Sequence, residues 1–151
     1  MAFGNRLVNT STGGGGGGPV YLAANGVTII ADSSAVSGQE YVLNGVSYLV
    51  LADKAALITA FNGGRNMATT VTTRVTNFYE LFQGLSGWND AIGNWDTSSV
   101  TNMGRMFQET DDFNQNLTYW CVTNITSEPS RWANKNSDFQ ESNYPVWGTC
   151  P

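Results

Sequence analysis

The side chains of this sequence best suited to chemistry are carboxylates in its second half. They are Asp90, Asp96, Glu109, Asp111 and Asp112. Two carboxyl groups about 5–10 Å apart could hydrolyse a glycosidic bond, and Asp111, Asp112 and Asn114 could bind calcium through oxygen. Their spacing matches no calcium loop of the EF-hand type, and adjacent carboxylates in a turn are usually hydrated. We therefore assign no catalytic residue and no metal ligand, and calcium at Asp111 and Asp112 stays an open alternative.

The remaining residue types also argue against an enzyme. The sequence has no histidine, which excludes an imidazole base or ligand. Its two cysteines, Cys121 and Cys150, are too far apart for a paired-thiolate metal motif. The net charge is −5, and the basic residues form no cluster along the chain, so nucleic acid is not an expected partner. We expect a non-enzymatic protein without a cofactor.

Aromatic residues are the other candidates for a binding site, because their faces stack on sugar rings. The chain has 5 tryptophans and 6 tyrosines. Trp95 and Trp120 occupy matching positions of a repeat, so packing in a core explains them better. Trp132 and Trp147 follow the repeat and are expected to cap its open end. One of these two tryptophans, or Tyr119, remains a candidate for a glycan site.

The repeat has a period of 25 residues and must position all of these groups. Val75-Thr76-Asn77 recurs as Val100-Thr101-Asn102 and then as Ile125-Thr126-Ser127. Each unit has a short β-prone stretch, followed by large apolar residues at i, i+3 and i+4, which share one face of a helical turn. One unit cannot bury these residues alone, so units stacked at the strand spacing of about 4.8 Å should bury them together. The residues expected in this core are Phe82, Trp95, Met103, Met106, Phe107 and Trp120.

The segment before the repeat has the features of a structured cap. Asn25-Gly26 and Asn44-Gly45 each lie between apolar runs, which is a strong signal for a β-hairpin. Asp53 is a suitable N-cap for a helix over residues 54–61, and Gly63-Gly64 would end it.

Residues 1–19 differ in character from the rest and are expected to form an attachment arm and a tether. The tether is the run of glycines from Gly13 to Gly18, which lack side chains that could hold them against a fold. The arm residues expected to bind a partner are Phe3, Arg6, Leu7 and Val8. The N-terminus lacks the apolar segment of a secretory signal, and no run is long enough to cross a bilayer. We expect no membrane partner and, if Met1 is the natural start, no export by the general secretion route.

Two stretches resemble a known family. "IGNWDTSSVTNMGRMFQ" and "FNQNLTYWCVTNIT" are similar to the repeats of the BspA-like surface proteins, the DUF285 group. The resemblance covers roughly residues 25–151. It implies a leucine-rich-repeat-like solenoid that serves adhesion or display, with no catalytic residues to transfer. The chain departs from the family in having only two full units, and Cys121 stands where the first unit has Asp96.

The expected fold is therefore mainly β with short helices. It is a leucine-rich-repeat-like β-solenoid of 25-residue repeats over residues 74–126, in a single domain of residues 20–151 with caps at residues 20–73 and 127–151. The C-terminal cap has no repeat pattern of its own and must be held over the open end. A disulfide between Cys121 and Cys150 would do this, and two buried free thiols are the alternative.

The expected function follows from two features together. The repeat domain is of a kind used on outer surfaces, and the sequence lacks an export signal. A structural protein of a bacteriophage virion, as a capsid decoration or a fibre, meets both conditions, because it is assembled in the cytoplasm and acts outside it. It would bind other virion proteins through its arm, be oligomeric in the assembly, and present an adhesin-like domain to a host-surface protein or glycan. The alternative is a bacterial cell-surface adhesin or an extracellular filament subunit. A carbohydrate-active enzyme is disfavoured.

Overall fold

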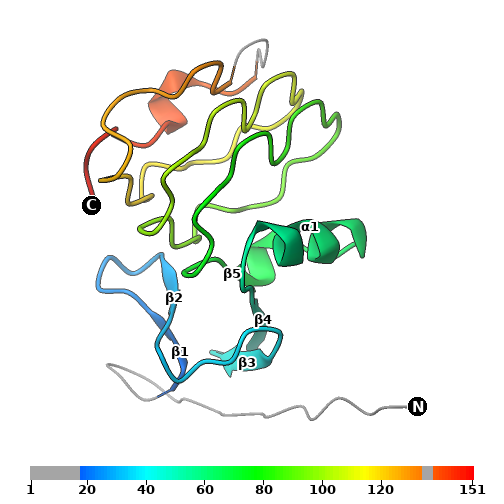
Figure 1. The fold of residues 1–151 in the computed structure, drawn as a ribbon, viewed down its shortest axis with the longest axis vertical. Helices are drawn as coiled ribbons and strands as arrows, with labels where there is room; N and C mark the ends of the chain where they lie inside the picture. The colour runs from blue at the N-terminus through cyan, green and yellow to red at the C-terminus, as the bar shows by residue number, and fades with distance from the viewer. Residues whose placement is uncertain (1–17, 134–137) are drawn as a thin grey trace.

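The protein consists of three parts that follow one another along the chain (Figure 1). The computed structural model describes residues 18–133 and 138–151. Two small sheets lie at one end, the repeat segments lie beyond them, and the C-terminal segment covers the far end of the repeats. The expected arm, with Phe3, Arg6, Leu7 and Val8, lies outside the described residues. Within those residues, no helix is long and apolar enough to span a membrane.

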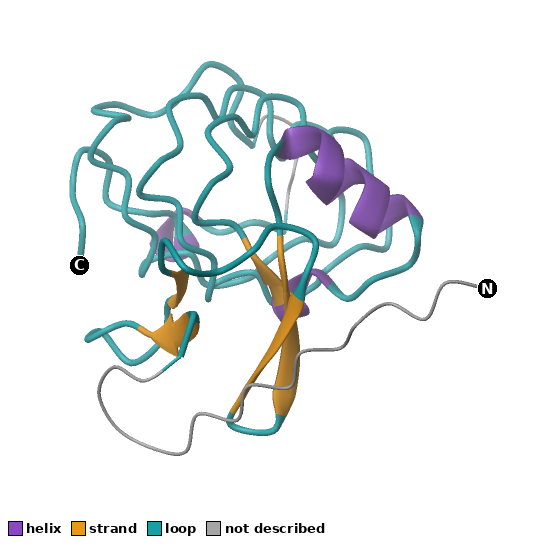
Figure 2. Ribbon diagram, turned by 60° about the horizontal axis from the view of Figure 1, so that its bottom comes forward, coloured by secondary structure: helices purple, strands orange, loops and turns teal. Residues whose placement is uncertain are grey.

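Both Asn-Gly signals lie in β-hairpins, but the hairpins belong to separate sheets (Figure 2). The first hairpin pairs β1 (Val20–Leu22) with β2 (Ile29–Ala31). The second pairs β3 (Glu40–Leu43) with β4 (Val46–Val50), and β4 also pairs in parallel with β5 (Thr70–Val71).

The two turns differ in geometry. Asn44 and Gly45 have φ values of 50° and 82°, and two positive φ angles are what a two-residue hairpin turn requires. Asn25-Gly26 lies instead in a longer loop, closed by a hydrogen bond from the Ala23 N–H to the Thr28 carbonyl at 2.8 Å.

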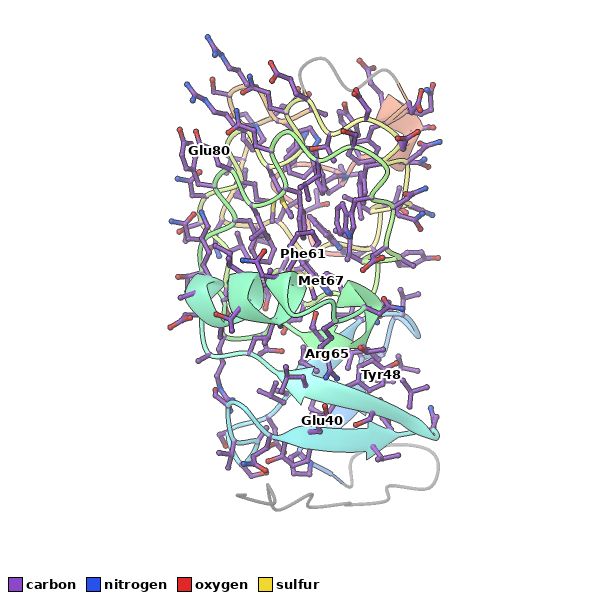
Figure 3. All side chains as sticks on the ribbon, turned by 90° about the vertical axis from the view of Figure 1, so that its right-hand side faces the viewer. Glu40, Tyr48, Phe61, Arg65, Met67 and Glu80 are labelled. Atoms are coloured by element: carbon purple, nitrogen blue, oxygen red, sulfur yellow. A yellow bond between two sulfur atoms is a disulfide. The ribbon has the colours of Figure 1, made fainter. Side chains whose placement is uncertain are left out.

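The helix lies where the sequence predicts it. The helix α1 (Lys54–Asn62) begins after Asp53, whose Oδ1 accepts a hydrogen bond from the Ala56 N–H at 2.9 Å. Arg65, which follows α1, pairs with Glu40 of β3 at 2.7 Å and so ties the helix region to the second sheet (Figure 3). Two short 3-10 turns complete the named elements, η1 (Met67–Thr69) and η2 (Glu141–Asn143).

The expected leucine-rich-repeat-like β-solenoid is wrong. After β5, the described part of the chain contains no further strand, and isolated bridges join Asn77 to Asn102 and Ile29 to Trp95. The chain there folds into consecutive turns, with left-handed φ angles of 55° at Glu80 and 56° at Arg105. Residues with left-handed φ angles interrupt the backbone repeatedly. The stretches between them are too short to pair with a neighbouring segment as a β-strand.

Neighbouring repeat segments nevertheless lie against each other and exchange backbone hydrogen bonds. The N–H groups of Phe78 and Phe82 donate to the carbonyls of Asn102 and Met106, at 2.7 and 3.1 Å. The N–H of Leu81, between them, donates within its own turn to the Phe78 carbonyl at 3.1 Å. Alternate N–H groups therefore serve the turn and the neighbouring segment, which satisfies the backbone without a sheet.

The core repeats along the chain as the sequence does. The side chains of Phe82, Trp95, Met103, Met106, Phe107 and Trp120 are all buried. The Trp95 and Trp120 rings are parallel within 4°, with centroids 6.2 Å apart. Their Nε1 groups donate to the carbonyls of Met67 and Ile92, at 2.9 and 3.0 Å. Because Met67 and Ile92 are also one period apart, the repeated contacts begin before the expected boundary at residue 74.

A glycine at one contact between segments gives a first testable prediction. A Cβ on Gly93 would lie 2.5 Å from the backbone carbonyl oxygen of Asn116, in the next segment. Gly93→Ala should therefore lower the free energy of unfolding by about 1–3 kcal/mol, because rigid backbone must move to make room. Urea denaturation measures the loss.

The matched control for this prediction is Gly104→Ala. A Cβ there would lie 3.2 Å from the Tyr79 ring, a side chain that can shift. We expect the smaller loss in this variant. If Gly104→Ala destabilises the protein as much as Gly93→Ala does, the close approach at Asn116 is not what limits position 93.

Candidate functional site

A pocket lies where the first hairpin meets the repeat segments. Its volume is about 260 Å³. Its wall combines an exposed aromatic ring, a buried carboxylate, polar groups of the hairpin loop, and the two cysteines. The residues that could contact a ligand there are Tyr119, Asp96, Ser98, Asn25 and Thr28.

Tyr119 contributes the exposed ring, because its neighbours in the same turn face inward. Leu117 and Trp120 are fully buried, and the Trp120 N–H closes the turn on the Leu117 carbonyl at 3.0 Å. Asn116 Oδ1 holds the turn by accepting hydrogen bonds from the Thr118 N–H and hydroxyl. Tyr119, between the two buried side chains, is 40% exposed. One period earlier the same position is Asn94, so the aromatic ring is a departure from the repeat.

Asp96 contributes a carboxylate that is only 4% exposed yet lines the pocket. Its Oδ1 accepts hydrogen bonds from the Ser98 N–H at 3.1 Å and the Ser98 hydroxyl at 2.7 Å. The side-chain hydrogen bonds of Asp96 within the described residues all end on Oδ1, which leaves Oδ2 as an acceptor for a ligand hydroxyl.

The hairpin forms the opposite wall and is held in place by the backbone. Ile29 bridges to Trp95, and its N–H donates to the Asn94 carbonyl at 2.8 Å. Asn25 Oδ1 accepts from two N–H groups of its own loop, and its Nδ2 donates to the Thr28 hydroxyl at 2.9 Å. The polar rim of the pocket is therefore ordered before any ligand binds.

The other carboxylates weighed from the sequence do not gather around a reacting centre. Asp90 Oδ2 accepts from the Met67 N–H at 2.8 Å, and Asp112 Oδ2 accepts from the Gly87 N–H at 2.9 Å. Glu109 and Asp111 are exposed. Among the described residues, no group of three histidine, cysteine, aspartate or glutamate side chains could hold a metal ion. These acids hold turns or face solvent, and Asp96 is the one that lines the pocket.

The predicted disulfide between Cys121 and Cys150 is confirmed. It joins the C-terminal residues to the segment that carries Tyr119, and both cysteines line the pocket.

The other aromatic candidates differ from Tyr119 in accessibility. Trp132 is fully buried, which removes it as a residue that could stack on a sugar, and Trp147 is half-buried with its ring 5.0 Å from that of Trp132.

The sequence made Tyr119 one of three candidates for a glycan site but did not connect it with the other residues that line the pocket. Asp96 was considered as an isolated acid, and Asn25 and Thr28 as parts of a hairpin. The signal that could have joined Asp96 to Tyr119 is their spacing of nearly one repeat period, which brings them to adjacent segments. No sequence signal places the hairpin loop beside them, because that contact depends on tertiary packing.

Comparison with known proteins gives one match. The model of a family described as "Mycoplasma protein of unknown function, DUF285" matches residues 53–147, which is more than half of the chain. No curated protein and no solved structure matches the chain.

Proposed function

The chain belongs to the DUF285, or BspA-like, family, and we propose that it is a non-enzymatic recognition domain that binds a glycan on an external surface. The observation that carries this proposal is the pocket that combines the exposed Tyr119 ring with the buried Asp96 carboxylate. An aromatic face binds the apolar face of a sugar ring, and a carboxylate oxygen accepts hydrogen bonds from its hydroxyl groups.

A binding role is favoured over hydrolysis because Asp96 is the one acidic side chain from the described residues that lines the pocket. Glycoside hydrolysis in its usual form needs a second carboxyl group across the scissile bond. The disulfide supports an external location, because such bonds persist in oxidising surroundings and are rare in the reducing cytosol.

The sequence favours a phage particle as the external surface, with the domain as a capsid decoration or fibre protein anchored by residues 1–12. A bacterial cell surface or an extracellular filament is the alternative setting. Neighbouring genes for capsid, portal or tail proteins would favour the particle, and neighbouring export genes would favour the cell surface. Glycan binding in the pocket serves attachment in either setting.

The pocket predicts a specific effect of changing Tyr119. The full chain should bind neutral oligosaccharides on a glycan array, and Tyr119→Ala should weaken binding of the best of them about tenfold, because the stacking surface is lost. Isothermal titration calorimetry measures the affinity. Since Tyr119 is half-exposed, the melting temperature should change little.

Tyr119→Phe is the matched variant, because it keeps the ring and removes only the hydroxyl. It should retain most of the affinity. Equal binding by Tyr119→Ala and the unchanged protein would show that the pocket is not the glycan site, and the absence of any bound neutral glycan would count against the proposed function itself.

A further inference from the structure

Three basic side chains that are scattered in the sequence surround one tyrosine, Tyr79. Lys54 begins α1, and its Nζ lies 5.9 Å from the centre of the Tyr79 ring and donates to the Tyr79 carbonyl. The guanidinium carbon of Arg105 lies 6.0 Å from the same ring centre. Arg131 follows Ser130, whose carbonyl accepts a hydrogen bond from the Arg105 N–H at 3.1 Å. We call Lys54, Tyr79, Arg105 and Arg131 the basic cluster.

The arginines of the basic cluster project from matching turns of successive segments. Each turn is closed by a hydrogen bond between residues three apart, and its third residue has a left-handed φ: 55° at Glu80, 56° at Arg105 and 56° at Arg131. The N–H of Arg105 donates to the Ser130 carbonyl at 3.1 Å. Because backbones bonded in this way lie about 5 Å apart, the two arginines form a short row.

Glu80 occupies the matching turn position in the segment before that of Arg105. Its carboxylate balances one positive charge of the basic cluster. It pairs with Arg105 at 3.0 Å, with both side chains 37% exposed. A hydrogen bond from the Tyr79 hydroxyl to Glu80 raises the pKa of Tyr79. Asp53 lies beside Lys54 in sequence, but its carboxylate caps α1. Figure 3 shows Glu80 at the flank of the repeat region, beyond α1. The basic cluster and these two carboxylates therefore sum to one positive charge, on a chain whose net charge is −5.

Tyr79 brings two cations of the basic cluster together. Lys54 Nζ and the Arg105 guanidinium both lie over its ring. The ring also lies against Gly104, where a Cβ would come within 3.2 Å of it, so the neighbouring turn can approach the ring closely.

We propose that the basic cluster binds an acidic polysaccharide, whose carboxylate or sulfate groups bind Arg105, Arg131 and Lys54. Guanidinium groups form paired hydrogen bonds with carboxylate and with sulfate alike. Cations on neighbouring segments fit a chain that carries acidic groups at regular intervals. A duplex nucleic acid fits less well, because its binding depends on many phosphate contacts. This site is separate from the Tyr119 pocket and does not depend on glycan binding there.

The test uses the full chain and four immobilised probes: heparin for sulfate, polygalacturonate for carboxylate, dextran for a neutral polysaccharide, and duplex DNA. We expect binding to heparin, polygalacturonate or both that weakens as salt is raised, whereas any binding to dextran should be unaffected by the Arg131 substitution. Arg131→Gln should lower the affinity about tenfold, because one charge-assisted contact is lost. The variant keeps a long unbranched side chain at the same left-handed position, so the fold should be preserved, as circular dichroism can verify.

Arg74→Gln is the control, since it removes the same charge from a guanidinium that donates to the Asp32 and Ala35 carbonyls and is not part of the basic cluster. It should bind as the unchanged protein does. An equal loss in Arg131→Gln and Arg74→Gln would overturn the proposal, because binding would then depend only on total charge. Failure to bind either acidic polysaccharide, or tighter binding of DNA than of both, would overturn it as well.

Discussion

Replacing Phe107 by alanine should lower the free energy of unfolding by about 3–5 kcal/mol, a large part of the stability of a domain of this size. Phe107 is fully buried. Its ring centroid lies 4.2 Å from that of Phe113, 4.9 Å from that of Trp132 and 6.0 Å from that of Phe82. The substitution removes contacts with the preceding segment, its own segment and the C-terminal cap at once. The enclosing rings belong to different segments, so they cannot all collapse into the space.

Urea denaturation followed by tryptophan fluorescence measures this loss. Val146→Ala is the control, because Val146 is 63% exposed and its truncation should change the free energy of unfolding by no more than about 0.5 kcal/mol. A Phe107→Ala variant that unfolds within about 1 kcal/mol of the unchanged protein would show that the segments do not share one core.

The sequence determined which residues share this core because burial follows the repeat period. Each large apolar residue of one unit has a counterpart 25 residues away, and the structure places such counterparts against each other, as with Trp95 and Trp120. The helix α1 could also be predicted from the sequence, because the Asp53 cap and the apolar spacing that follows it are local signals. Features that depend on nearest neighbours along the chain, or on an unbroken period, could be predicted.

The expected β-solenoid is wrong because the backbone inside each unit is decided by features that leave no clear signal in the sequence. Valine and threonine before Asn77 and Asn102 favour strands, yet pairing there is a single isolated bridge. The turns that follow need left-handed φ angles at Glu80 and Arg105, positions where glycine or asparagine would be the recognisable residues. Because charged residues occupy these positions, the sequence does not indicate a turn there. The apolar residues around them are spaced as in a helix.

One extra residue after the second unit prevented the sequence comparison from detecting the last repeat-like turn. The turn from Met103 to Met106 has its counterpart between Pro129 and Trp132, one residue beyond a full period. The Phe107 N–H still donates to the Trp132 carbonyl at 2.9 Å. Contacts between segments therefore continue past residue 126, where the sequence pattern stops. A constant-period comparison loses such a segment even though its packing resembles that of the units before it.

The candidate site shows the same division between local and long-range information. Tyr119 became a candidate because its ring could stack on a sugar. The basic cluster was missed, although Lys54 and Tyr79 are one repeat period apart and Arg105 and Arg131 are one residue more than a period apart.

Replacing both Cys121 and Cys150 by serine should lower the free energy of unfolding by about 3–4 kcal/mol, because the disulfide restricts the unfolded chain over a sequence separation of 29. The segment it closes is also held to the repeats by aromatic packing and by backbone hydrogen bonds. The Val122 N–H donates to the Thr149 carbonyl at 2.8 Å, and the Gly148 N–H donates to the Ile125 carbonyl at 2.9 Å. These bonds cover the far end of the core, where Trp132 would otherwise meet solvent.

Thermal unfolding with and without reducing agent separates the bond from the change of side chain. The unchanged protein under reducing conditions should melt near the double serine variant, and the variant should not respond to the reductant. A double variant that melts with the unchanged, oxidised protein would show that the hydrogen bonds alone hold the cap. The expected result would mean that this domain reaches full stability only where disulfides persist. Because both cysteines also line the Tyr119 pocket, reduction would then loosen the proposed glycan site together with the cap.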